Sequence, residues 1–149
     1  MAGIRFLTAT FIGAIVLGAG GLLTYGGLLP AFLPDFLNAG SAVGVLRSRV
    51  GFEAAALDIV ANAGLLTLVI ELSRIRSAVA GALLAALLAA LQWMAADWLL
   101  YAVANIGDVR GVMLDPLLKA GPDAGAGAVI AAVLKVQTGA ERHPVPVRH

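Results

Sequence analysis

The sequence contains no cysteine, and only 13% of its 149 residues carry a formal charge. The absence of cysteine excludes disulfide bonds, thiol nucleophiles and thiolate metal sites, and it leaves the redox compartment open. The formal net charge is only +1, and no basic run is interleaved with aromatic residues. We therefore expect no nucleic-acid partner.

Histidine and the common catalytic motifs are also scarce. The two histidines, His143 and His149, both lie in the C-terminal tail, so we expect no histidine-based haem or metal site inside the protein. The chain has no G-x-S-x-G elbow, no Walker loop and no dinucleotide fingerprint. We predict neither a metal nor a cofactor, and the sequence leaves open whether the protein is an enzyme.

Apolar residues are abundant, at 60% of the chain. The most informative stretch is residues 78–106, which contains a single formal charge, Asp97. A helix of this length reaches about 43 Å, more than the roughly 30 Å of a bilayer core. The stretch therefore predicts a membrane-spanning helix that is tilted or that extends beyond the bilayer.

Two further apolar runs precede this stretch. Residues 6–29 carry no charge, and the run is longer than the roughly 7–15 apolar residues of a signal peptide, which favours a retained helix. Residues 54–70 form a second predicted span. Because only a short connection follows it, we expect the second and third spans to pair as an antiparallel hairpin.

The last third of the chain is harder to assign. Residues 107–123 are polar and rich in turn formers, so they predict a connection. Residues 124–136 are apolar but fall short of the roughly 17–25 residues of a span. They form either a fourth span, extended through Gly121 and Gly139, or a segment that only dips into the interface. We favour a fourth helix that packs on the other three.

The chain thus predicts an all-α integral membrane helical bundle of three to four transmembrane helices. Residues 1–140 would form a single transmembrane domain, and residues 141–149, with two prolines, a disordered tail. With four spans and an internal N-terminus, six of the ten lysines and arginines lie inside. We therefore predict a bacterial inner-membrane protein with its N-terminus inside.

A polar stripe marks the second half of the third span. Trp93, Asp97, Tyr101 and Asn105 recur every four residues and so share one slowly drifting helix face. An ionisable group at this depth is costly unless it faces protein, water or a ligand. We expect the function of the protein to centre on Asp97.

Other polar side chains share the expected depth of Asp97. Antiparallel pairing places Asp58 and Asn62 of the second span in the same half of the bilayer, where Tyr25 ends the first span. A molecule entering from that leaflet would meet both acids. We therefore predict Asp97 and Asp58 as catalytic carboxyl groups. The predicted substrate-binding residues are Trp93, Tyr101, Asn105, Asn62, Tyr25 and Trp98.

A purely structural interpretation stays open. The two acids could be hydrogen-bonded to Asn62, Asn105 or Tyr101 and simply hold helices together, as polar residues do in membranes. Trp98 lies nearer the interface and fits an aromatic-belt residue equally well.

The residues that remain suit acid–base chemistry. One or two carboxyl groups, with Tyr and Asn as hydrogen-bond partners, would serve an isomerase, a cyclase or a cofactor-free oxygenase acting on a lipophilic small molecule. The alternative is a non-catalytic accessory subunit of a larger membrane complex. Besides the lipid bilayer, the predicted partners are thus a lipophilic small molecule and either a second copy or a larger complex.

The order of elements resembles a known family. The first helix ends in Gly-Gly-Leu-Leu-Pro, a long loop follows, two spans meet around Arg74 and Arg76, and the exit contains Asn105. This plan resembles small four-helix bacterial membrane proteins of the anthrone-oxygenase-like family, and transmembrane-protein-205-like proteins share a similar one. The resemblance covers the first three helices and implies a lipophilic aromatic or polycyclic substrate. The last third lacks the Trp/Arg-rich helix start of the first family and the histidine of the second, so no catalytic residue is carried over.

Overall fold

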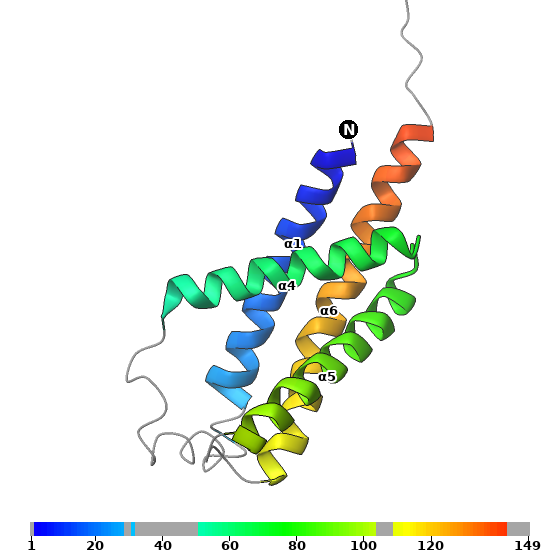
Figure 1. Ribbon diagram of the computed structural model, residues 1–149. Helices are drawn as coiled ribbons and strands as arrows, with labels where there is room; N and C mark the ends of the chain where they lie inside the picture. Colours follow the sequence, from blue (N-terminus) through cyan, green and yellow to red (C-terminus); the bar gives the residue numbers. More distant parts are fainter. Residues whose placement is uncertain (1, 29–30, 32–50, 104–108, 143–149) are drawn as a thin grey trace, which may run out of the picture.

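The computed structural model describes residues 2–28, 31, 51–103 and 109–142, and nearly all of these are helical (Figure 1). Within this part of the chain there is no strand, which confirms the all-α prediction. The elements are α1 (Ala2–Leu23), which runs into the π-helical turn η1 (Thr24–Leu28), α4 (Phe52–Leu72), α5 (Ala78–Val103) and α6 (Val109–Arg142).

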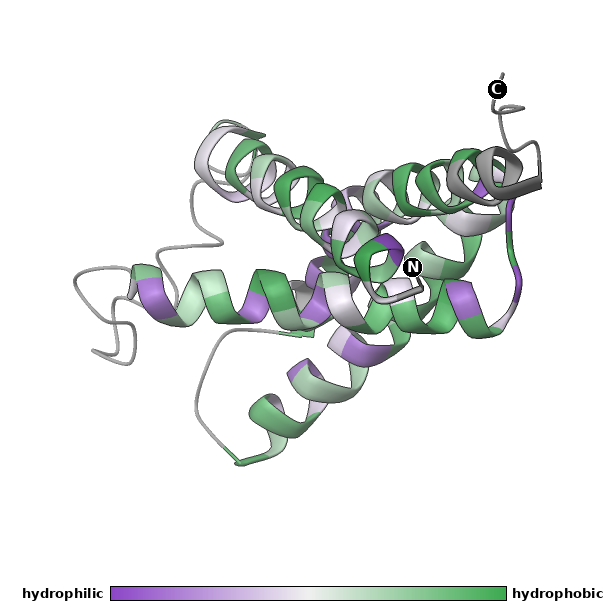
Figure 2. Ribbon diagram, turned by 90° about the horizontal axis from the view of Figure 1, so that it is seen from above, coloured by the Kyte–Doolittle hydropathy of each residue, from purple (hydrophilic) through white to green (hydrophobic). Residues whose placement is uncertain are grey.

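Four helices in the described part are long and apolar enough to cross a membrane, and the fourth of them lies within α6. Large apolar side chains such as Phe11, Leu57, Leu83 and Leu117 are exposed on their outer faces. Figure 2 shows apolar residues along all four helices, interrupted by isolated hydrophilic ones. An apolar exterior of this extent is what a lipid-facing bundle requires. The protein is therefore an integral membrane helical bundle with a fourth span.

The predicted connection at residues 107–123 is wrong from residue 109 onward, because α6 begins at Val109 and contains Pro116 and Pro122. A proline inside a helix removes one backbone hydrogen bond, which is why the sequence pattern favoured a loop. Membrane helices tolerate proline where neighbouring helices satisfy the freed groups, and Pro116 is fully buried. At its other end α6 continues through Arg142, two residues into the predicted tail. Residues 143–149 lie outside the described residues.

Helix α6 is the centre of the bundle, since it packs against α1, α4 and α5. Helix α5 runs alongside α6 in the opposite direction, whereas α4 lies across α1 and α6 (Figure 1). The predicted antiparallel hairpin of the second and third spans is therefore wrong, because α4 and α5 barely touch beyond the turn that joins them. Helix α5 packs on α6 instead, through a face of small residues.

That face consists of Gly81, Ala85 and Ala89, all buried, and the first two lie against Gly127 of α6. A Cβ atom at Gly81 would overlap the carbonyl oxygen of Gly127, and one at Gly127 would overlap the side chain of Ala85. Small residues at both positions let the two backbones approach closely, which is how helices associate in lipid. The close approach fixes the register in which the polar residues of α5 and α6 meet.

Helix α1 uses glycine in the same way. A Cβ atom at Gly13 would lie 2.6 Å from Ile130, and one at Gly20 would lie 2.9 Å from Pro122. Around these contacts Leu17, Leu66, Ile70, Ile130 and Leu134 form the buried core. The α1–α6 packing brings the end of α1 beside the middle of α6.

Candidate functional site

Two polar stripes face each other between α5 and α6. On α5, Trp93 and Asp97 are one turn apart, and on α6 Asp115, Lys119 and Asp123 follow at the same four-residue spacing. Residues four apart lie on one helix face. Because the helices are antiparallel, Trp93 meets Lys119 and Asp97 meets Asp115.

Lys119 is held between two aromatic rings. Its Nζ atom lies 4.1 Å from the centroid of the Trp93 ring and 4.9 Å from that of the Tyr25 ring. Both distances are within the range of a cation–π interaction, which gains strength where water is scarce. The ammonium group is thus stabilised within a helix long and apolar enough to span the membrane.

The carboxyl groups of Asp97 and Asp115 are neighbours across the contact between α5 and α6. The Tyr25 hydroxyl donates a hydrogen bond of 2.6 Å to Oδ1 of Asp115, which orients that carboxyl group. Oδ2 of Asp97 is buried and accepts no hydrogen bond from any described residue. Buried acceptors are nearly always satisfied, so this oxygen is positioned to receive a hydrogen-bond donor.

We name these five residues the α5–α6 cluster: Tyr25, Trp93, Asp97, Asp115 and Lys119. Tyr25 reaches it from η1, where the last turn of the first span widens into a π-helix that contains Gly26 and Gly27. Single π-helical turns are frequent at functional sites because they re-aim side chains. The cluster therefore combines three spans.

A second polar contact links α4 to α6. Nδ2 of Asn62 donates a hydrogen bond of 3.0 Å to Oδ1 of Asp123, whose residue is only 2% exposed. The pair satisfies a buried carboxyl group, and we interpret it as a structural contact.

Replacing Asn62 with leucine should destabilise the protein by about 1–3 kcal/mol, because the buried Asp123 carboxyl loses its donor. Thermal unfolding in detergent, followed by circular dichroism, measures the loss. As a control, Asp123→Asn keeps an acceptor for Asn62 and should unfold close to the wild-type temperature. An Asn62→Leu protein as stable as the wild type would contradict the structural role of this pair.

The predicted site residues are only partly brought together. Asp97, Trp93 and Tyr25 lie in one cluster. Asp58 is exposed on α4, and the carboxyl neighbour of Asp97 is Asp115 instead, because α4 does not pair with α5. Asn62, likewise predicted near Asp97, bonds to Asp123.

The remaining predicted residues lie towards the end of α5. The rings of Trp98 and Tyr101 meet edge to face at 5.8 Å, and the residues are 41% and 40% exposed. This placement agrees with the aromatic-belt alternative for Trp98. Asn105 lies outside the described residues.

Sequence reasoning missed Asp115, Lys119 and Asp123, which it assigned to a connection. Their four-residue spacing was a usable signal for one helix face. Two prolines and several glycines in the same segment argued for turns and outweighed it. Within the described residues, no group of three or more histidine or acidic side chains is arranged to hold a metal ion.

Comparison with known proteins identifies no relative. No protein-family model matches the sequence, and no curated protein and no solved structure shows significant similarity to it. The resemblance to the anthrone-oxygenase-like family therefore stays a prediction.

Proposed function

We propose that the protein binds a lipophilic small molecule at the α5–α6 cluster and transfers a proton to or from it through Asp97. The observation that carries this proposal is the buried Oδ2 atom of Asp97, which has no hydrogen-bond donor among the described residues. A ligand with an O–H, N–H or acidic C–H group would supply the missing donor. The position of the cluster, between apolar helices that could span a bilayer, favours a molecule that reaches it through the lipid.

The neighbours of Asp97 suit proton transfer. When the ligand gives a proton to Asp97, the negative charge that develops on the ligand is stabilised by the Lys119 ammonium group. Asp115, oriented by Tyr25, lies beside Asp97 as a second proton acceptor. Return of the proton to a different atom of the ligand completes an isomerisation or a cyclisation, and neither needs a further reactant.

Extraction of the purified protein tests the binding step. Wild-type protein purified in mild detergent should release a small molecule into organic solvent, detectable by mass spectrometry. In Asp97→Asn the affinity should fall roughly 10-fold, because the ligand then donates to a neutral amide oxygen, and a hydrogen bond to a charged carboxylate is about twice as strong. Asp58→Asn makes the same chemical change outside the α5–α6 cluster and should release as much as the wild type. Equal release from Asp97→Asn and wild type would contradict the proposal.

A second candidate function is an accessory subunit of a larger membrane complex. The observation that favours it is Asp58, which is exposed on α4 beside the exposed Leu57 and Val60. A carboxyl group on the outer face of a spanning helix is costly in lipid unless a partner covers it. The same purification distinguishes the two functions, since a stoichiometric partner chain that is lost in Asp58→Asn favours the subunit.

A further inference from the structure

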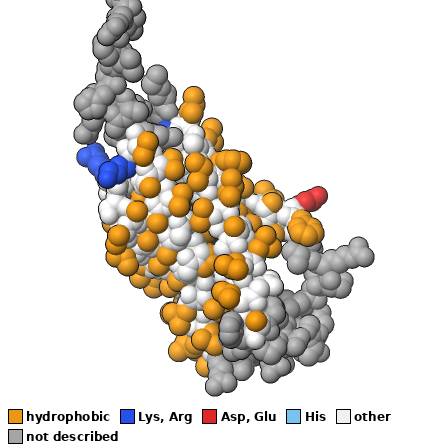
Figure 3. Space-filling view, turned by 180° about the vertical axis from the view of Figure 1, so that it is seen from behind, with side chains coloured by type: hydrophobic (Ala, Val, Ile, Leu, Met, Phe, Trp, Pro, Cys, Tyr) orange, Lys and Arg blue, Asp and Glu red, His pale blue; other side chains and the backbone are white. Residues whose placement is uncertain are grey.

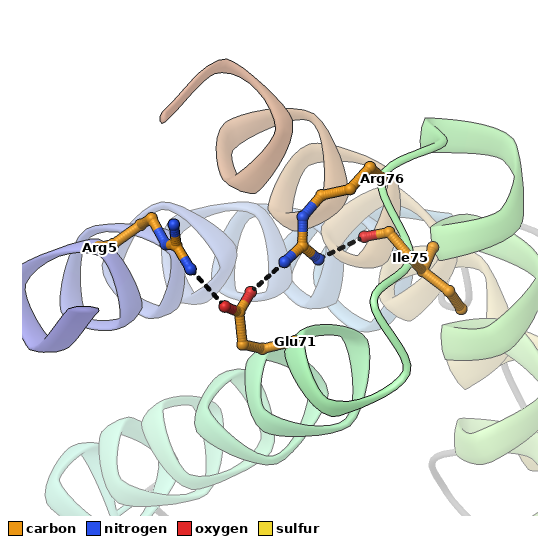
Figure 4. Close-up of polar contacts among 4 residues, drawn as sticks. All are labelled: Arg5, Glu71, Ile75 and Arg76. Carbon is orange, nitrogen blue, oxygen red and sulfur yellow. Dashed lines mark hydrogen bonds and ion pairs between the residues drawn. The ribbon is translucent and has the colours of Figure 1, made fainter. Parts of the chain in front are cut away.

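The connection between α4 and α5 lies against an ion-pair clamp (Figure 4). Glu71, near the end of α4, accepts 2.5 Å and 2.8 Å hydrogen bonds from Nη2 of Arg5 and Nη2 of Arg76. Nη1 of Arg76 also donates to the carbonyl oxygen of Ile75. Both oxygens of Glu71 are therefore occupied, and the clamp fixes the start of α1 and the α4–α5 connection to the end of α4.

Arg74, in the same connection, has no such partner. Its residue is exposed, and among the described residues no carboxylate pairs with its guanidinium group. On the face seen in Figure 3, lysine and arginine side chains gather at the edge that carries the α4–α5 connection in Figure 1. Over the rest of that face, hydrophobic side chains alternate with uncharged side chains and backbone, apart from an acidic patch at the opposite edge.

The backbone gives no reason for an arginine at this position. The amide of Ile75 bonds to the carbonyl of Ile70 and that of Arg74 to the carbonyl of Glu71, the two bonds of a Schellman motif. The motif places its next-to-last residue in the left-handed region, where glycine is preferred, and Arg74 has a φ of 53°. A charged side chain thus occupies a position where the left-handed backbone conformation favours glycine.

We infer that Arg74 binds the phosphate of an anionic phospholipid headgroup. The connection joins two helices that are each long enough to cross the bilayer, so it lies where the chain leaves the hydrocarbon and meets headgroups. A guanidinium group matches phosphate geometry with two parallel hydrogen bonds. Attraction to anionic lipid is worth about five-fold in affinity for each arginine near the surface. This inference is independent of the proposed function.

Lipid titration of the full-length protein, read by native mass spectrometry in detergent, tests the inference. The wild type should retain phosphatidylglycerol in preference to phosphatidylcholine. In Arg74→Gly, retention of phosphatidylglycerol should fall about five-fold, whereas that of phosphatidylcholine, whose choline cation repels the arginine, should fall less. Arg74→Gly should unfold at a temperature equal to or higher than that of the wild type, because glycine is preferred in the left-handed backbone conformation. Arg74→Lys keeps the charge but not the two parallel hydrogen bonds, so its retention of phosphatidylglycerol should fall between that of the wild type and that of Arg74→Gly.

Three results would overturn the inference. They are equal retention of the two lipids by the wild type, unchanged retention of phosphatidylglycerol in Arg74→Gly, and displacement of phosphatidylglycerol by an equal concentration of soluble glycerol phosphate. The last result would assign the position to a free anion.

Discussion

Asp97→Asn should fold normally and turn over the molecule bound at the α5–α6 cluster about 10²–10⁴-fold more slowly than the wild type. Asparagine keeps the shape of the side chain and most of its hydrogen bonds, but it cannot accept a proton. The measurement is a single-turnover assay with the extracted molecule, together with thermal unfolding in detergent.

The matched control is Asp58→Asn, which removes an exposed carboxyl group on α4 and should keep the wild-type rate. If Asp97 only holds helices together, Asp97→Asn keeps its activity and the larger truncation Asp97→Ala lowers the unfolding temperature. A stable and fully active Asp97→Asn protein would end the catalytic proposal and leave the accessory-subunit candidate ahead.

Gly127→Ala should destabilise the bundle by about 2–3 kcal/mol, at the upper end of the usual cost of overpacking. The added methyl group would overlap both the side chain of Ala85 and the backbone carbonyl of Gly81. A backbone carbonyl in a spanning helix cannot rotate aside as a flexible side chain can. Helix α5 would have to move away from α6, which also separates Trp93 from Lys119. Unfolding in increasing denaturing detergent measures the loss.

Gly125→Ala is the matched control, in the same helix and two residues away. Its added methyl group would meet only Val16, at an ordinary 3.5 Å. Because alanine is the better helix former, this variant should be as stable as the wild type or up to about 1 kcal/mol more stable. Equal stability of the Gly127 and Gly125 variants would show that α5 and α6 do not pack as closely as the structure indicates.

The spans themselves could be predicted from the sequence because hydrocarbon imposes a simple requirement. A long run with few or no charges indicates a helix, and over their described residues the runs 6–29, 54–70 and 78–106 correspond to α1 with η1, α4 and α5. The length of the fourth helix was underestimated because proline and glycine lower helix propensity in any sequence, and the sequence does not show the packing that offsets this effect. In α6 the packing of Pro116 and Pro122 against the other helices overrides that local preference.

Helix pairing could not be predicted, because chain order does not determine which helices pack together. The small-residue face of Gly81, Ala85 and Ala89 selects α6 as the partner of α5. The sequence pattern had assigned the first half of α6 to a connection, so this partner was not considered over its full length. This error explains the site as well. The four-residue stripe predicted Asp97 as a site residue. Its carboxyl neighbour is not Asp58, as predicted, but Asp115, which lies in the part of α6 that the sequence pattern assigned to a connection.

The charges of α6 have a consequence for how the chain enters the membrane. Asp115, Lys119 and Asp123 lie within a candidate span, and this span is the least apolar of the four. Each charged residue near the centre of an isolated helix opposes partition from the translocon into lipid by roughly 2.5–3.5 kcal/mol. Only residues 104–108 separate α6 from α5, whose aromatic and small residues cover this polar face. Helix α6 is thus expected to integrate during synthesis together with α5, as one unit, and to fail to integrate when it is translated alone.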